Sequence, residues 1–175
     1  MVISMNFKKI FLNTIMIFIL CSIFHFGYDL FPCFLTSLFF PVNESVFEHL
    51  KMIFTATCFF SLLSNIFYKD KNILFKTYLR SMASIIILLL LYLPVNYLLG
   101  ENMIITLLIL FISIFFSEMI CSRISRKKDY HLVNKVSLVL LILNFVIFAI
   151  CTYYPPKMGL FLDKKEEIYG IDIPK

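Results

Sequence analysis

Apolar residues in this sequence come in long runs that short polar segments separate. A run of about 20 apolar residues crosses a hydrocarbon layer of about 30 Å as an α-helix, because each residue adds 1.5 Å. The runs predict five membrane-spanning helices, at about residues 10–30, 45–68, 78–99, 102–121 and 136–154. We therefore expect an all-α integral membrane bundle that forms one domain over residues 1–175. Residues 155–175 are its polar C-terminal tail, which we expect outside the cytoplasm.

The segment from Phe31 to Pro41 interrupts this pattern. It is apolar, but it is too short to cross the layer, and it has prolines at Pro32 and Pro41. Backbone that is not helical is tolerated at membrane depth only where protein buries it or where it lines a polar cavity. We expect this segment to be re-entrant or to lie in the interface between lipid and water.

The composition agrees with lipid as the solvent. The 175 residues are 61% hydrophobic and 15% charged, whereas a soluble domain is about 45–50% apolar and about 25% charged. The formal net charge is +5, but the basic residues are scattered between apolar runs and line no single polar surface. This distribution argues against nucleic acid as a partner. The lipid bilayer is the partner that the composition indicates, and protein partners stay open.

Basic residues are distributed unequally between the two sides of the five-span arrangement. Lysine and arginine near the ends of spans are retained in the cytoplasm. One side carries most of the 16 basic residues, namely Lys8, Lys9, Lys69, Lys71, Lys76, Arg80, Arg123, Arg126, Lys127, Lys128 and Lys135. The asymmetry predicts a multi-pass protein of the bacterial cell (cytoplasmic) membrane, with its N-terminus inside and its C-terminus outside.

The tail combines charges with apolar side chains. A disordered tail is poorer in large apolar residues, and this one contains Leu160, Phe161, Ile168 and Tyr169. We therefore expect the tail from Pro155 to Ile171 to fold back over the outer surface of the bundle.

Ionisable residues gather near the outer ends of the first two spans, in the sequences HFGYD (25–29) and PVNESVFEHLK (41–51). On a continuous helix, His25 and Asp29 are four residues apart and share a face. Ionisable groups at membrane depth are costly and usually face the protein interior. Because the second span must descend beside the first, we expect His25 and His49 to come within about 8 Å of each other, with Asp29 and Glu48 beside them.

Helix capping is one explanation for the second group. Ser45-x-x-Glu48 has the form of a capping box, in which the two side chains satisfy free backbone amides at the start of the second span. Acidic side chains there also suit the positive end of the helix dipole. Capping does not explain His49, nor the pair His25 and Asp29.

A metal or proton site is the other explanation, because histidines and carboxylates at helical spacing can bind Zn²⁺ or act as an acid–base pair. Glu44 is then the general acid or base, and the metal ligands are His25, Asp29, Glu48 and His49. The chain would be a membrane-embedded, metal-dependent hydrolase that acts on a lipid or peptide at the outer leaflet, with Zn²⁺ as its cofactor. The segment lacks the two histidines of HExxH, and the leading interpretation is a multi-pass membrane protein of undetermined activity. Whether it is an enzyme stays open.

Three motifs carry a resemblance to a known family. The motifs HFxYD and PVNESxxEHLK, with a C-terminal PPKxxLFxD followed by YGI, together cover most of the chain. The sequence resembles a family of small bacterial multi-pass membrane proteins of unknown function. The resemblance implies the five-span fold and supplies no activity.

A second likeness concerns the zinc site of the alkaline ceramidases and the progestin and adipoQ receptors. That site uses histidines with an acidic residue and a serine near the ends of spans, and Glu44, Ser45 and His49 are similar to this set. This chain departs from that group in having five predicted spans in place of seven and no HxxxH in its last span. The likeness implies only the alternative function, a membrane-embedded hydrolase.

Overall fold

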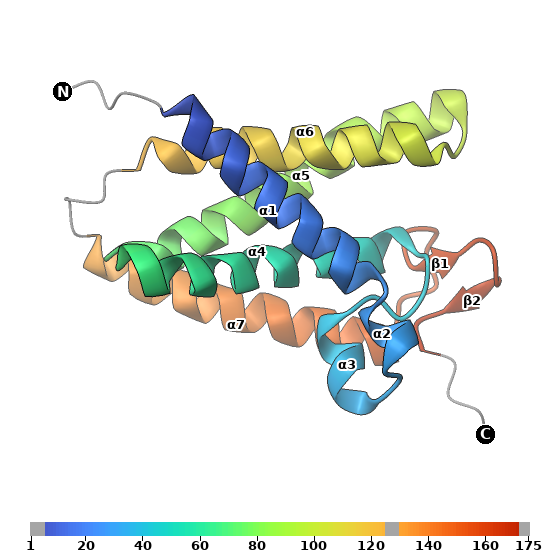
Figure 1. Cartoon of the computed structure of the whole chain (residues 1–175). Helices are drawn as coiled ribbons and strands as arrows, with labels where there is room; N and C mark the ends of the chain where they lie inside the picture. Colours follow the sequence, from blue (N-terminus) through green and yellow to red (C-terminus); the bar gives the residue numbers. More distant parts are fainter. Residues whose placement is uncertain (1–5, 125–129, 172–175) are drawn as a thin grey trace.

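The computed structural model describes residues 6–124 and 130–171 and shows a bundle of long helices (Figure 1). Within these residues, five helices are long and apolar enough to cross a membrane: α1 (Phe7–His25), α4 (Val46–Tyr68), α5 (Ile73–Leu99), α6 (Met103–Ser122) and α7 (His131–Tyr153). This arrangement confirms the predicted all-α, multi-pass membrane bundle. Part of the predicted charge asymmetry lies outside the described residues. These positions are the basic residues Arg126, Lys127 and Lys128 and the acidic residue Asp129.

Short elements cover one end of the bundle. The helices α2 (Gly27–Leu30) and α3 (Phe34–Phe39) follow α1, in the segment that the sequence predicts to be re-entrant or interfacial. The strands β1 (Leu162–Asp163) and β2 (Ile168–Tyr169) follow α7 and pair antiparallel. Figure 1 shows all four elements at the same end of the long helices.

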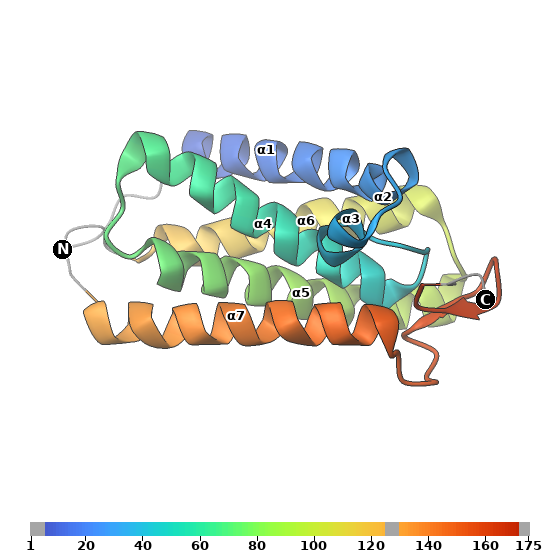
Figure 2. The same cartoon turned by 90° about the horizontal axis from the view of Figure 1, so that it is seen from below.

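Four of the long helices form a ring. The helix α4 packs against α1 and α5, and α6 closes the ring by packing against the same two helices. The helix α7 packs against α5 and also contacts α3. In Figure 2, α1 and α7 lie at opposite edges of the bundle.

A buried polar cluster joins the four helices of the ring. Arg80 on α5 pairs with Glu118 on α6 through Nε and Oε1, and both side chains are buried. The Arg80 guanidinium donates to Ser61 Oγ on α4 at 2.6 Å, and Asn13 Nδ2 on α1 donates to Glu118 Oε2 at 2.8 Å. Charges are tolerated in an apolar interior only when they are paired and hydrogen-bonded. These contacts therefore help to specify which helices are neighbours.

The first span is interrupted after His25. The helix α1 ends at His25, and the separate helix α2 begins at Gly27. Glycine weakens a helix, and the ring of Phe40 packs so closely on Gly27 that a Cβ there would lie 2.5 Å from ring atoms. Because the helix breaks here, His25 and Asp29 do not lie on one continuous helix as the sequence predicts.

The tail is folded against the same end of the bundle. The Phe47 amide donates to the Leu160 carbonyl at 3.0 Å, and Asn43 Nδ2 donates to the Gly170 carbonyl at 2.8 Å. Gly170 has φ of +64°, and a Cβ there would collide with the carbonyl oxygen of Thr152. Up to Ile171 the tail therefore covers the loop before α4, as its apolar residues predict.

Candidate metal site

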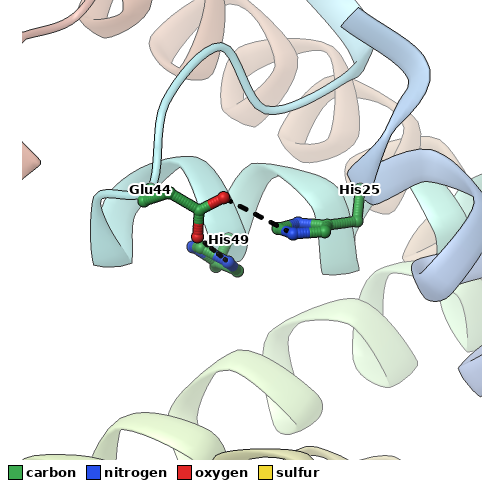
Figure 3. Close-up of side chains that lie close together, drawn as sticks. All are labelled: His25, Glu44 and His49. Carbon is green, nitrogen blue, oxygen red and sulfur yellow. Dashed lines mark ion pairs between the residues drawn. The ribbon is translucent and has the colours of Figure 1, made fainter. Parts of the chain in front are cut away.

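Three ionisable side chains converge at the end of the bundle where the tail packs (Figure 3). His25 is the last residue of α1, Glu44 lies in the loop before α4, and His49 lies in the first turn of α4. His25 Nε2 is 3.5 Å from Glu44 Oε1, and His49 Nε2 is 3.7 Å from Glu44 Oε2. The centroids of the two imidazole rings are 5.3 Å apart, which is within the separation that the sequence predicts.

These side chains can direct their donor atoms to a common point. One donor atom from each of His25, Glu44 and His49 lies within 4.8 Å of the other two. Ligands at about 2.0–2.2 Å from a tetrahedral Zn²⁺ lie about 3.3 Å from one another. The two nitrogen–oxygen distances, each to a different Glu44 oxygen, are close to this ligand–ligand distance. Both exceed the length of about 2.7–2.9 Å of a charge-assisted hydrogen bond.

A backbone carbonyl orients His49. Its Nδ1 lies 2.8 Å from the Ser45 carbonyl oxygen, and because a carbonyl only accepts, Nδ1 carries the proton of this hydrogen bond. In the neutral ring, Nε2 then presents its lone pair toward Glu44. Histidine ligands of metals usually donate their other N–H to a carbonyl or a carboxylate in this way.

Asp163 of the tail holds the loop that carries Glu44. Its Oδ2 accepts from the Glu44 amide at 2.7 Å, and its Oδ1 accepts from the amides of Lys165 at 2.8 Å and Glu166 at 3.3 Å. Burial raises the pKa of the Asp163 carboxyl, but these amides lower it more, so its pKa lies below the ordinary value. The group is ionised at neutral pH. Sequence reasoning assigned Asp163 no role, although it belongs to the motif LFxD.

The sequence matches the model of one protein family over almost its whole length. The model is described as a family of unknown function, DUF6512, and it matches residues 1–171. The chain belongs to DUF6512. No curated protein and no solved structure matches it. Membership confirms the resemblance to a family of unknown function and assigns no activity to this DUF6512 chain.

Glu48 of the DUF6512 chain contacts other partners than the two histidines. Its side chain is 1% exposed, its Oε2 lies 2.5 Å from Lys51 Nζ, and its Oε1 accepts from Thr152 Oγ1 at 2.8 Å. Lys51 is 0% exposed and also donates to the Ser37 carbonyl at 2.8 Å. This network joins α3, α4 and α7. It gives Glu48 a complete set of structural partners.

The capping box is half formed. Ser45 is the N-cap of α4, and its Oγ accepts from the Glu48 amide at 3.4 Å. The return bond from Glu48 to the Ser45 amide does not form, because that amide donates to Asn43 Oδ1 at 2.9 Å. Glu44 precedes this N-cap, so it lies in the loop and can turn its carboxylate between the histidines.

The structure thus brings together three of the five candidate residues. His25 and His49 meet as expected, and Glu44, which the sequence suggests as the general acid or base, lies between them. Asp29 is exposed on α2, and Glu48 is enclosed by Lys51 and Thr152. Neither of them belongs to the group whose donor atoms converge.

Proposed function

We propose that this DUF6512 chain is a membrane-embedded metalloprotein that binds one Zn²⁺ ion through His25, Glu44 and His49. The supporting observation is the position of one carboxylate between two imidazoles, with one oxygen toward each ring. In the tautomer that donates from Nδ1 to the Ser45 carbonyl, the lone pair of His49 Nε2 faces the Glu44 carboxylate and repels it. A divalent cation between them turns this repulsion into coordination.

An ion pair between Glu44 and protonated histidines is the competing explanation. It fits the distances less well, because 3.5 and 3.7 Å exceed a charge-assisted hydrogen bond. Protonation of both rings would also place two like charges 5.3 Å apart. One Zn²⁺ ion would bind all three side chains without requiring either ring to be protonated.

The number of protein ligands favours hydrolysis as the activity. Catalytic zinc sites have three protein ligands, including sets of two histidines and one glutamate, and keep a fourth position for water or substrate. When bound, zinc lowers the pKa of its water to about 7 and so supplies a nucleophile at neutral pH. Glu44 then acts as a ligand in place of the general acid or base that the sequence suggests. The substrate class that this position would serve is a lipid or peptide.

We further propose that the site lies at the outer face of the cytoplasmic membrane. The excess of lysine and arginine at the opposite ends of the spans supports a cytoplasmic N-terminus. The tail packs at the end of the bundle that holds His25 and Glu44 (Figure 1). An extracytoplasmic tail therefore places the metal site outside as well.

Elemental analysis of the purified, detergent-solubilised full chain tests the metal proposal. We expect about one zinc ion per chain, and we expect Glu44→Gln and His49→Ala to remove it while circular dichroism stays helical. The matched controls are Glu166→Gln and His131→Ala, because both side chains are exposed and lie outside the converging group. Both controls should retain the metal.

The result that would contradict the proposal is a folded, metal-free wild-type chain from zinc-replete cells. Iron in place of zinc would support the ligand set but change the chemistry, since two histidines and one carboxylate also form the facial triad of Fe(II) oxygenases.

A further inference from the structure

A lysine of the tail lies at the edge of the proposed metal site. Lys165 Nζ is 4.0 Å from Glu44 Oε2, and the Lys165 side chain is 71% exposed. At this distance the pair is a loose, solvent-screened contact that contributes little to stability. The ammonium group therefore stays available to a ligand that approaches the site from solvent.

The backbone around Lys165 is fixed. Asp163 is buried and accepts from both the Lys165 amide, at 2.8 Å, and the Glu44 amide, at 2.7 Å. The Asp163 carboxylate thus positions the backbone of both Glu44, a proposed metal ligand, and Lys165, the neighbouring cation. The adjacent Lys164 has a different partner, because its Nζ lies 2.6 Å from Glu101 Oε1 at the turn between α5 and α6.

The ends of membrane-spanning helices lie near the lipid headgroups, and the proposed site is at such an end. His25 ends α1, so the metal ligands stand at the end of a membrane-spanning helix. The short segment beside it exposes large apolar side chains, namely Leu30, Phe31, Phe34 and Leu35. Exposed apolar groups next to the end of a span are typical of segments that lie in the membrane interface. The phosphates of phospholipids occupy the same layer.

We propose that the ligand of this site is an anionic phosphate group, which binds the open metal position and the ammonium of Lys165 together. This inference rests on the proposed function. A divalent ion and Lys165 together balance the carboxylates of Glu44, Asp29 and Asp163, so an incoming phosphate meets two cations at a site without excess negative charge. Lysine binds phosphate as a point charge, and the metal is a Lewis acid toward phosphoryl oxygen. The phosphate belongs either to a lipid headgroup or to free phosphate.

A cobalt-substituted protein tests this proposal. The purified full chain is loaded with Co²⁺, and inorganic phosphate is titrated while the visible absorption of the metal is followed. We expect Lys165→Met to raise the Kd for phosphate about tenfold, as for the loss of a hydrogen bond to a charged group. Lys164→Met removes the same charge from the neighbouring position and should leave this Kd unchanged. Equal Kd values in the two variants would overturn the proposal.

Two short-chain lipids separate the sources of phosphate. Dioctanoyl phosphatidic acid carries the phosphate, and dioctanoylglycerol has the same acyl chains without it. Tighter binding of phosphatidic acid than of inorganic phosphate supports a lipid ligand, and the reverse order supports free phosphate. Equal binding of the two lipids would overturn the proposal, because it would assign recognition to the acyl chains.

The outcome for the metal separates this inference from the proposed function. If the protein binds Co²⁺ and neither phosphate compound changes its spectrum, the phosphate proposal fails alone. If Co²⁺ does not bind, the proposed function fails.

Discussion

Asp163 and Glu44 are 119 positions apart in the chain, and the Glu44 amide donates to Asp163 Oδ2 at 2.7 Å. This hydrogen bond makes the C-terminal hairpin a structural part of the candidate metal site. The tail does more than cover the bundle, because it determines where the loop before α4 holds its carboxylate.

Asp163→Ala should weaken metal binding without removing a ligand. The variant frees the Glu44 amide, so the proposed ligand loses the contact that positions its backbone. Loss of an outer-shell partner typically lowers metal affinity about 10–100-fold, and a Co²⁺ titration of the purified chain measures this change. Glu166→Ala is the control, because its side chain is exposed and its amide remains. Equal affinity in the two variants would show that Asp163 does not support the site.

Lys51→Met should destabilise the protein strongly. It leaves Glu48 buried without its cation, and breaking a buried pair costs about 3–5 kcal/mol. The double variant Glu48→Gln with Lys51→Met removes both charges and should regain part of this loss in a thermal unfolding assay. It should also retain the metal. If the double variant folds but binds no metal, Glu48 is a metal ligand after all.

Glu118→Ala should destabilise the ring of four helices in a similar way. It leaves the buried Arg80 guanidinium without its carboxylate and removes the acceptor of Asn13, at a cost of about 3–5 kcal/mol. Glu101→Ala is the matched control, because it breaks an exposed pair with Lys164 that contributes at most about 1 kcal/mol. Equal melting temperatures for the two variants would contradict the structural role of the buried pair.

Cysteine labelling in intact cells tests the orientation. Replacing the exposed Cys33 with serine first removes a native reactive thiol. In that background, Lys157→Cys should react with an impermeant maleimide, whereas Lys71→Cys should react only after permeabilisation, because the two positions lie at opposite ends of the spans. The opposite pattern would place the metal site in the cytoplasm.

The long helices could be predicted from the apolar runs, because their lengths follow from the thickness of the bilayer. One boundary depends on tertiary contacts. The helix α5 begins at Ile73, ahead of the span predicted from about residue 78, and it includes charged side chains. Lys76, in the part of α5 that precedes the predicted span, pairs with Asp70. A hydropathy pattern cannot supply such partners.

The candidate site could be predicted only in part. Antiparallel neighbouring spans are enough to expect His25 near His49. The placement of Asp29 depends on the helix break where Phe40 packs on Gly27. The placement of Glu48 depends on Thr152, which is 104 positions away. Both are long-range contacts, and local spacing carries no information about them.

X-ray absorption at the metal edge is the most direct test of the central claim, that His25, Glu44 and His49 hold one zinc ion. We expect a first shell of nitrogen and oxygen at about 2.0–2.2 Å with the outer-shell scattering of two imidazoles, and no sulfur shell at about 2.3 Å. Glu44→Gln and His49→Ala should abolish this signal. A sulfur shell, or an unchanged spectrum in both variants, would contradict the claim.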